Sequence, residues 1–412
     1  MKLFGLLGRK LFHSISPEIH NLLCDYEYVL FEREPDELDG FFEKREFSGL
    51  NVTIPYKKDV IKYCAELSDT AKKIGSVNTI TVQPDGTLYG DNSDYFGFSY
   101  MIEQSGIEIA GKTVLVLGTG GASLTVKAVV EDMGAKEIVS VSRTGDVNYE
   151  NVYQYKNADV IVNTTPVGMY PHNGERVIDL SRFPSLSGCL DLIYNPSLTP
   201  FLYDAKNLGV PYANGLSMLV AQAQMSAEKF VEGKIPQSKI DEVINELASL
   251  RKNIVLIGMP GCGKSTVSAL LGKEFDREVV DTDALVEANE GKSIPEIFAT
   301  SGEEYFRSAE TKAVSDCTKK SGLVIATGGG AVLREENRYF LKQNSFIVWL
   351  KRDFNRLATE GRPLSKSLDD IKKIEAVRAP VYASLADTEV EVDDDPKVTL
   401  VKILDAVKGD IK

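Results

Sequence analysis

The chain has 412 residues, 43% of them hydrophobic, and a formal net charge of −13. This length predicts two or three domains of ordinary size. The acidic balance argues against a nucleic-acid-binding surface, although local basic pockets for phosphates or carboxylates remain compatible with it. Five scattered cysteines without a Cys-x-x-Cys pair, and only three histidines, argue against a disulfide framework or a zinc centre. No apolar run approaches the roughly 18 residues of a membrane span, so we expect a cytoplasmic protein without membrane partners.

Strand-like apolar runs alternate with helix-length segments along the whole chain, which predicts α/β architecture with parallel sheets. In the first hundred residues we expect a helix that opens at Ser16-Pro17 and strands at residues 3–7, 49–53 and 77–82. The next stretch has the spacing of a Rossmann unit, with strands expected at residues 114–117, 138–141, 160–163 and 190–193. Residues 214–248 have a helical pattern, residues 238–252 form an amphipathic helix, and a second large domain is expected from residue 252.

A first glycine-rich loop follows the strand at 114–117 and reads Gly118-Thr119-Gly120-Gly121-Ala122. A glycine turn that opens a Rossmann helix suits a dinucleotide pyrophosphate, although Ser123 replaces the third glycine of the usual pattern. About 20 residues later, where an NAD-binding domain places an acidic residue, the chain has Ser142-Arg143-Thr144. This favours the 2′-phosphate of NADP, whereas Asp146 close by opposes it; a merely structural turn is the alternative.

A second glycine-rich loop lies between a strand at 254–257 and a helix expected near Lys264. Its pattern, Gly-x4-Gly-Lys-Ser, is typical of a nucleoside triphosphate site. Lys264 would bridge the β- and γ-phosphate oxygens, and Ser265 would bind Mg²⁺. The backbone that surrounds the β-phosphate would come from Gly261, Cys262, Gly263, Lys264, Ser265 and Thr266.

Residues 3–245 resemble the shikimate dehydrogenase family, on motifs that occur in order at compatible spacing. These motifs are His13–Pro17, Asn51–Lys57, Val77–Thr79, Asp91–Asp94, Asn163–Met169, Asp191–Tyr194 and Gly215–Gln222. The resemblance implies that Lys57 is the general acid for ketone reduction and that Asp94 holds it while contacting a substrate hydroxyl. It implies that the substrate carboxylate is bound by Ser14 and Ser16, and the ring hydroxyls by Thr53, Asn78, Asp94, Tyr194 and Gln222. The implied NADP(H) site consists of Gly118, Gly120, Gly121, Ala122, Ser142, Arg143, Thr144, Leu192 and Gly215.

Residues 252–412 resemble shikimate kinase, on Asp281-Thr282-Asp283, Gly302–Arg307, Gly328-Gly329-Gly330, Gly361–Leu364 and Arg378. The resemblance implies that Asp283 orients or deprotonates the attacking hydroxyl and that Asp281 acts in the Mg²⁺ shell. Arg307 and Arg378 would clamp the substrate carboxylate, which a planar guanidinium does better than an ammonium. Gly329 would let the substrate ring approach the backbone. Arg362, on a lid, would neutralise charge on the transferred phosphoryl group of ATP. The acidic run Asp393–Asp395 is interpreted as a solvated turn.

Together the two resemblances imply three domains: a substrate-binding domain from residues 1–100 and 214–248, a Rossmann NADP-binding domain from 101–213, and a P-loop domain of the nucleoside-monophosphate-kinase type from 252–412. They imply that the chain reduces 3-dehydroshikimate to shikimate with NADPH and then phosphorylates shikimate with ATP and Mg²⁺. Two alternatives stay open. In the first, the N-terminal half is an NAD-dependent quinate/shikimate dehydrogenase. In the second, the chain is a metabolite-sensing regulator built from degenerate enzyme domains. The presence of Lys57, Asp94, Lys264 and Asp283 argues against the regulator.

Overall fold

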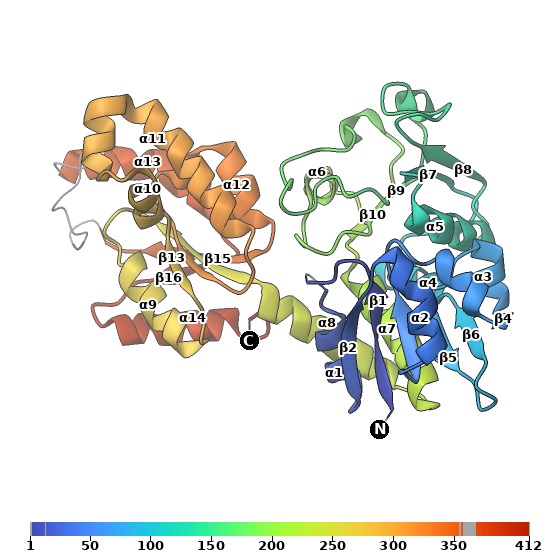
Figure 1. Cartoon of the computed structure of the whole chain (residues 1–412). Coiled ribbons are helices and arrows are strands. Elements are labelled where there is room, and N and C mark those ends of the chain that lie inside the picture. The colour runs from blue at the N-terminus through green and yellow to red at the C-terminus, as the bar shows by residue number, and fades with distance from the viewer. Residues whose placement is uncertain (1, 13, 354–355, 357–367, 412) are drawn as a thin grey trace. The chain divides into compact units, whose positions relative to one another are not determined.

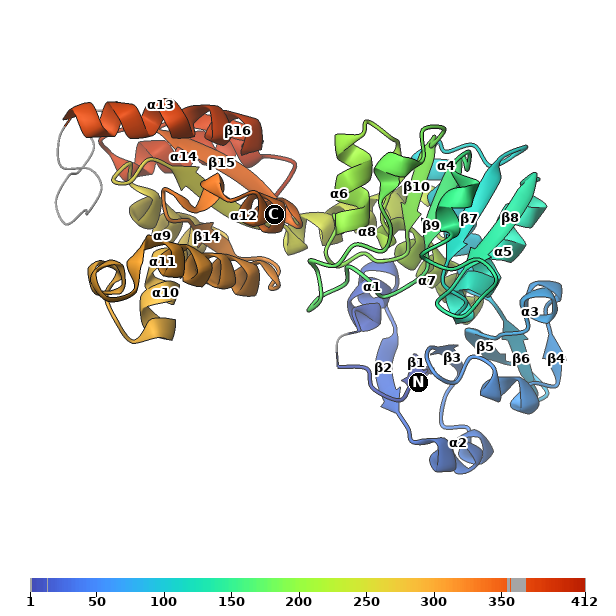
Figure 2. The same ribbon diagram turned by 90° about the horizontal axis from the view of Figure 1, so that it is seen from above.

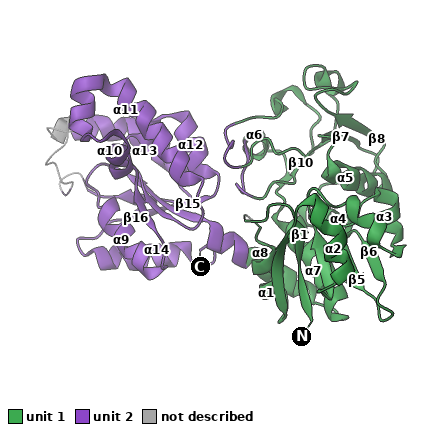
Figure 3. Ribbon diagram, viewed as in Figure 1, with its two compact units in different colours: residues 1–169, 175–194, 201–245 green, residues 170–174, 195–200, 246–412 purple. Residues whose placement is uncertain are grey.

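The computed structural model describes residues 2–12, 14–353, 356 and 368–411. The chain divides into two compact units (Figure 3). Unit 1 comprises Met1–Met169, Glu175–Tyr194 and Phe201–Asn245, and unit 2 comprises Tyr170–Gly174, Asn195–Pro200 and Glu246–Lys412. The boundary after Asn245 therefore falls inside a helix, α8 (Gln237–Arg251). Within the described ranges, no helix is both long and apolar enough to cross a membrane.

The first sheet of unit 1 is mixed, with six strands in the order β2-β1-β3-β5-β6-β4 (Figure 1). Strand β1 pairs in parallel with β2 and β3, whereas β5 is antiparallel to both β3 and β6. The strands are β1 (Leu3–Gly8), β2 (Glu27–Glu32), β3 (Gly49–Val52), β4 (Glu66–Leu67), β5 (Thr79–Val82) and β6 (Leu88–Asp91). The accompanying helices are α1 (Ser16–Leu23), α2 (Leu38–Lys44) and α3 (Asp69–Ile74).

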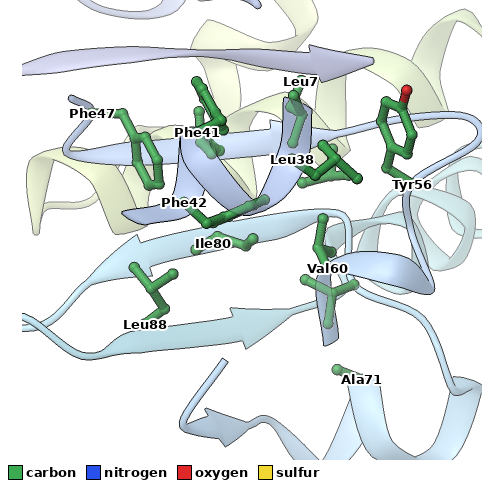
Figure 4. Packing of buried hydrophobic residues seen from close by; sticks show 13 residues of the cluster. Leu7, Leu38, Phe41, Phe42, Phe47, Tyr56, Val60, Ala71, Ile80 and Leu88 are labelled. Carbon is green, nitrogen blue, oxygen red and sulfur yellow. The ribbon is translucent and has the colours of Figure 1, made fainter. Parts of the chain in front are cut away.

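Aromatic and aliphatic side chains fill the space between this sheet and α2. Phe42 of α2 lies next to Ile80 of β5, and Phe41 and Leu7 of β1 belong to the same cluster (Figure 4). These four side chains are at most 9% exposed, so the cluster holds strands β1, β3 and β5 at fixed positions. That matters for function because the loops that leave β1 and β3 carry several of the predicted site residues.

The second sheet of unit 1 is entirely parallel, in the order β11-β10-β9-β7-β8, and forms a lobe distinct from the first sheet (Figure 2). Its strands are β7 (Thr113–Leu117), β8 (Glu137–Val141), β9 (Val160–Asn163), β10 (Gly188–Asp191) and β11 (Tyr212–Ala213). The helices of this part are α4 (Ser93–Ser105), α5 (Gly121–Asp132), α6 (Pro200–Asn207) and α7 (Leu216–Val231). The strand order reverses at β7, and in such sheets ligands bind where the carboxyl ends of the strands meet that reversal.

Unit 2 contains a five-stranded parallel sheet in the order β13-β14-β12-β15-β16. The strands are β12 (Asn253–Gly258), β13 (Val279–Asp281), β14 (Val324–Ala326), β15 (Ser345–Lys351) and β16 (Thr388–Glu391). Helices cover both faces, with α9 and α14 on one side and α11, α12 and α13 on the other (Figure 1). The helices are α9 (Lys264–Glu274), α10 (Thr282–Glu290), α11 (Ile294–Thr318), α12 (Glu335–Lys342), α13 (Leu368–Leu385) and α14 (Pro396–Val407). Strand β12 is buried along its whole length, which explains its continuous apolar sequence.

The α/β class and the predicted strands are confirmed, with small shifts at their ends, but the first sheet is mixed and not parallel as expected. The strand expected at residues 190–193 lies two positions earlier, as β10, and the strand expected from residue 77 begins only at Thr79, as β5. The backbone of Asn78 still bonds to both neighbouring strands, since its N–H donates to the carbonyl of Asp91 and its carbonyl accepts the N–H of Val52. Its side-chain oxygen accepts the backbone N–H of Ser93 at 2.7 Å. The helix expected at Ser16-Pro17 begins as predicted, with proline in its first turn.

Candidate active sites

A close ion pair joins two predicted site residues of unit 1. Lys57 Nζ lies 2.6 Å from Asp94 Oδ2, with the two side chains 26% and 14% exposed. Lys57 follows β3 in a tight loop, and its carbonyl accepts the N–H of Val77. Asp94 is in the first turn of α4, where the side chain of Asn92 accepts its N–H. Both groups are therefore held by backbone bonds, and the half-buried pair keeps a positive ammonium beside a carboxylate.

Asn78 and Gln222 meet at a serine that the sequence reasoning did not assign. Ser93 Oγ donates to Asn78 Oδ1 at 3.2 Å and lies at the same distance from Gln222 Oε1. Gln222 comes from α7, which approaches α4 closely: a Cβ at Gly97 would stand 2.5 Å from the carbonyl oxygen of Met218. This glycine lets the two helices bring Gln222 to the beginning of α4, next to Asp94. A serine one position before the predicted aspartate was the available sequence signal.

The remaining predicted substrate residues of unit 1 lie in the segments that follow strands β1, β3 and β10. Ser14 Oγ donates to Ser16 Oγ at 3.1 Å, so these two hydroxyls pair with each other at the beginning of α1. Thr53 directly follows β3, and its N–H donates to the carbonyl of Leu7 in β1. Tyr194 follows β10. The loops that carry them all leave the carboxyl ends of parallel strands, which is where the two sheets present their loops.

The glycine loop after β7 is tightened by the residue that departs from the usual pattern. Ser123 is 1% exposed, and its Oγ donates to the carbonyl of Gly120 at 2.7 Å. Gly118 has φ of 104°, and a Cβ there would stand 2.7 Å from Thr164 Oγ1. Side chains at Gly120 and Gly121 would meet no atom within 4 Å, so the backbone of this turn is open on that side. An N-terminal turn with exposed N–H groups suits a pyrophosphate.

Leu192 and Gly215, predicted for the same cofactor, lie against each other. A Cβ at Gly215 would stand 2.1 Å from the carbonyl oxygen of Leu192, so only glycine fits there. Two fully buried side chains join the carboxyl ends of β9 and β10, because Asn163 Nδ2 donates to Asp191 Oδ1 at 3.0 Å. Asn163 and Asp191 were quoted as motif residues without a role, and the structure gives them this positioning contact.

The predicted 2′-phosphate residues Ser142, Arg143 and Thr144 follow β8 in a turn. The N–H of Ser142 donates to the carbonyl of Val147, which closes the turn. Arg143 is exposed. Burial raises the pKa of Tyr149, and the positive charge of Arg143 acts to lower it. The guanidinium is therefore accessible to an anion at the end of β8, where the Rossmann fold places the ribose.

A cavity of about 650 Å³ in unit 2 gathers almost all of the residues predicted for the triphosphate half. They come from the loop after β12, the beginning of α10, helix α11, the loop after β14, and α13. The predicted residues that line it are Gly261, Gly263, Lys264, Ser265, Thr266, Asp281, Asp283, Arg307, Gly329 and Arg378. Cys262 belongs to the loop after β12 and is fully buried. Arg362 lies outside the described residues.

The glycines of the loop after β12 permit its tight curve. Gly258, Gly261 and Gly263 have φ of 146°, 80° and 105°, a region that favours glycine. Lys264 begins α9, and its Nζ donates to the carbonyls of Gly258 and Met259 at 2.9 and 3.1 Å. Ser265 Oγ donates to Asp281 Oδ2 at 2.8 Å, which joins the loop to the end of β13. Two oxygen ligands of the kind that Mg²⁺ prefers thus lie together.

A half-buried carboxylate, Asp283, and a buried one, Glu310, face the same cavity. Burial raises the pKa of Asp283 from 3.8 to about 6, and the charges of Glu310 and Asp281 act in the same direction, against Lys264 and Arg307. Glu310 is 1% exposed, and burial raises its pKa as well, opposed mainly by Arg307. The sequence reasoning weighed Glu310 only as a structural partner of Arg307. Its position three residues after Arg307 on a helix was the signal that both share one face.

Of the two arginines predicted to bind a carboxylate, Arg307 already contacts acidic groups. Arg307 Nη1 and Nη2 lie 2.8 Å from Glu310 and 3.3 Å from Glu303. Arg378, 6% exposed, contributes a second positive charge close to Glu310. Five N–H donors allow Arg307 to keep Glu310 and still bind an additional anion.

The three consecutive glycines after β14 each face a different part of this cavity. A Cβ at Gly328 would stand 2.5 Å from Asp283 Oδ1, and one at Gly330 would stand 2.6 Å from Arg307 Nη1. Gly329 packs against Pro260 of the other glycine loop, and its carbonyl accepts the hydroxyl of Tyr382 at 2.5 Å. The run is therefore a packing requirement of the site rather than a loose turn.

Comparisons with known proteins agree with both halves. Residues 6–80 match the family model "Shikimate dehydrogenase substrate binding domain", and residues 260–408 match the model "Shikimate kinase". The chain is 39% identical over 252 residues to a shikimate dehydrogenase (NADP(+)) of Clostridium beijerinckii, which covers 56% of this chain and 93% of that protein.

Solved structures are similar over the same part of the chain. A chorismate mutase/shikimate 5-dehydrogenase fusion protein from Clostridium acetobutylicum has 38% identity and a TM-score of 0.58, covering 60% of this chain and 97% of its own. A shikimate 5-dehydrogenase from Thermus thermophilus, in complex with NADP(H) and shikimate, has 28% identity and a TM-score of 0.55, covering 60% and 99%.

Proposed function

The chain belongs to the shikimate dehydrogenase family and continues into a shikimate kinase domain, and on this premise we propose that it catalyses two consecutive reactions. The first reduces 3-dehydroshikimate to shikimate with NADPH, and the second transfers the γ-phosphoryl group of ATP to shikimate. The observation that carries the proposal is that two separately folded sites match families that share one metabolite. The chain is thus an oxidoreductase and a kinase of the shikimate pathway.

In the first reaction we assign the proton transfer to Lys57. NADPH supplies the hydride when bound. The Lys57 ammonium polarises the ketone and then gives its proton to the forming alkoxide, while Asp94, 2.6 Å away, holds the ammonium in place and accepts a substrate hydroxyl. Asn78 and Gln222, which meet at Ser93, offer amide groups to the ring hydroxyls. Thr53 and Tyr194 complete this set, and Ser14 and Ser16 bind the substrate carboxylate.

The residues around β7 and β8 fit NADP. The open turn at Gly120 and Gly121 presents backbone N–H groups to the pyrophosphate, and Gly118 permits the sharp bend before it. Arg143 is placed to pair with the 2′-phosphate, and Ser142 and Thr144 supply hydroxyls beside it. Leu192 and Gly215 form the wall on which the nicotinamide end would rest.

In the second reaction we assign the acceptance of the hydroxyl proton to Asp283. Its pKa of about 6 leaves it ionised at neutral pH and more basic than an ordinary aspartate, which suits a general base. Arg307 and Arg378 hold the substrate carboxylate, and Lys264 and Arg362 stabilise charge on the transferred group. We propose that Ser265 and Asp281 hold Mg²⁺, the aspartate through water.

The same assignments imply the three domains: residues 1–100 with 214–248, residues 101–213, and residues 252–412. The separate mixed and parallel sheets of unit 1 and the third sheet in unit 2 support this division. The five cysteines are all free, which supports the proposal of a reducing, cytoplasmic location.

The proposal is tested by giving the purified protein shikimate in two separate reactions. With NADP⁺ we expect NADPH formation, and with ATP and Mg²⁺ we expect shikimate phosphate and ADP. Failure of either product would reject the corresponding half. Repeating the first reaction with NAD⁺, and with quinate in place of shikimate, tests the alternative; higher kcat/KM with NAD⁺ or quinate would replace the proposed dehydrogenase by that one.

A further inference from the structure

Two short segments of the dehydrogenase half of the sequence fold as part of unit 2. They are Tyr170–Gly174, which begins seven positions after β9 ends, and Asn195–Pro200, which begins four positions after β10 ends (Figure 3). No sequence pattern indicated this, because both segments lie between the strands of the Rossmann sheet. Their contacts within unit 2 converge on one residue, Gln343, directly after α12.

The first segment makes a reciprocal amide pair with Gln343. Asn173 Nδ2 donates to Gln343 Oε1, and Gln343 Nε2 donates to the carbonyl of Asn173 at 2.8 Å. The hydroxyl of Tyr339 donates to the same carbonyl at 2.7 Å. Asn173 is 1% exposed and Gln343 is fully buried, so these bonds are shielded from water. The hydroxyl of Tyr170 also donates to the carbonyl of Thr318, at the end of α11, at 2.6 Å.

The second segment binds the backbone of the same glutamine. Ser197 Oγ and the N–H of Leu198 both donate to the carbonyl oxygen of Gln343, each at 2.9 Å. Leu198 is 8% exposed and Thr199 is fully buried. The side chain of Gln343 thus binds the first segment, and its backbone carbonyl binds the second.

Such an arrangement differs from a loop that merely rests on a surface. A loop resting on a surface buries apolar groups and leaves its polar groups to water, whereas here buried amides and carbonyls find complementary partners. A buried amide that loses its partner costs free energy that water cannot restore unless the site opens. Residues 246–412 alone therefore lack groups that their own buried atoms require.

We propose that Tyr339, Gln343 and Thr318 form a docking surface in the kinase unit for two segments of the same chain, Tyr170–Gly174 and Asn195–Pro200. The sequence of the dehydrogenase half thereby completes the fold of the kinase unit. A perturbation of either segment loosens α12, and a perturbation of Gln343 loosens both segments. This inference rests on the contacts of unit 2 and not on either catalytic activity.

The test is hydrogen–deuterium exchange of the full-length chain, read by mass spectrometry of its peptides. Gln343→Ala should accelerate exchange of the amides of residues 170–174 by about tenfold or more, because the side-chain amide that pairs with Asn173 is removed. Exchange of residues 195–200 should rise less, because the backbone carbonyl that binds Ser197 and Leu198 remains. Asn337→Ala is the matched control. It removes another fully buried amide of α12, whose Nδ2 donates to the carbonyl of Ala331 at 2.9 Å, and should leave both segments protected as in the parent chain.

The reciprocal variant is Asn173→Ala, which should accelerate exchange of residues 335–343 by a similar factor. Asn151→Ala serves as its control, because Asn151 bonds the backbone of its own loop at Asp146 and Asn148. The double variant Asn173→Ala/Gln343→Ala should exchange no faster than the faster single variant, since the two changes remove one shared interaction.

The proposal would be overturned if both segments exchanged as slowly in Gln343→Ala as in the parent chain. It would also be overturned if the two substitutions had fully additive effects on exchange in the double variant. If Gln343→Ala does not fold, Gln343→Met keeps the length of the side chain without a buried charge and removes its bonds with Asn173. It should raise exchange of residues 170–174 more than that of residues 195–200, and no change in either segment would also overturn the proposal.

Discussion

Lys57 and Asp94, 37 positions apart in the sequence, lie with their charged atoms 2.6 Å apart, one in the loop after β3 and the other in the first turn of α4. The antiparallel pairs β3–β5 and β5–β6 bring the two loops together, because β6 leads directly into α4. The ion pair is thus a product of sheet topology and not of local spacing.

Lys57→Ala should lower kcat/KM for reduction of 3-dehydroshikimate by about 10²–10⁴-fold, the range of a lost general acid. Phosphorylation of shikimate by the same preparation should remain near the parent rate. The neighbouring exposed lysine gives the control, since Lys58→Ala should leave both reactions unchanged. A folded Lys57→Ala protein that retains ketone reduction would remove Lys57 from the mechanism.

Lys264→Ala should have the converse effect, with loss of ATP-dependent phosphorylation and normal ketone reduction. Its ammonium lies inside the curve of the loop after β12, bonded to two loop carbonyls, where phosphate oxygens would be met. Lys273→Ala, an exposed position on the same helix, is the control, and steady-state assays of both reactions are the measurement. Loss of both activities in a folded Lys264→Ala protein would contradict two independent sites.

Asp283 should set the acid limb of the kinase pH profile. With a pKa of about 6, it becomes protonated below that pH, and kcat/KM for phosphorylation should fall about tenfold for each further unit. The profile is measured between pH 5 and 8 with ketone reduction as the internal comparison. A kinase profile without an inflection in this range would argue against Asp283 as the base.

The same pKa predicts a dependence of stability on pH. Since the native state holds the Asp283 proton more tightly than the unfolded state does, native stability falls as pH rises from about 4 to about 6. Asp283→Asn has no carboxyl group to titrate and therefore does not lose this stability. Above pH 6 the variant should melt at a higher temperature than the parent chain, although we expect it to be inactive as a kinase. Each kcal/mol corresponds to roughly 2–4 °C for a domain of this size. A melting difference that does not grow between pH 4 and 6 would contradict the raised pKa.

Arg143→Ala should raise KM for NADPH by about 10–100-fold, the range expected when a charge-assisted bond to phosphate is lost. KM for NADH should change little, because that cofactor lacks the 2′-phosphate. Arg182→Ala is the control, since Arg182 lies over the ring of Tyr153, 3.4 Å from its centroid. Equal increases for both cofactors would show that Arg143 does not read the 2′-phosphate.

Local patterns were sufficient for several of the elements and for the glycine loops. The alternation of apolar runs predicted the strands to within a few residues, and Gly258–Ser265 indicated a strand–loop–helix turn by itself. Local pattern did not predict the contacts of the acidic run, which was expected to be a solvated turn. Asp395 caps α14, and Asp394 pairs with Arg352 and Arg356. Those arginines lie more than 35 positions away, beyond the reach of any local pattern.

The sequence by itself determined which groups are present: a lysine and an aspartate for proton transfer, two kinds of phosphate-binding loop, and arginines for carboxylates. Only the tertiary structure decided which of these groups meet, because each depends on how strands from distant segments pair. Ser123 replaces an expected glycine and compensates through a hydroxyl bond to Gly120, which only the first turn of α5 reveals. The amide pair of Asn173 and Gln343, 170 positions apart, is the extreme case. Burial makes such a pair specific, and burial is a property of the folded chain alone.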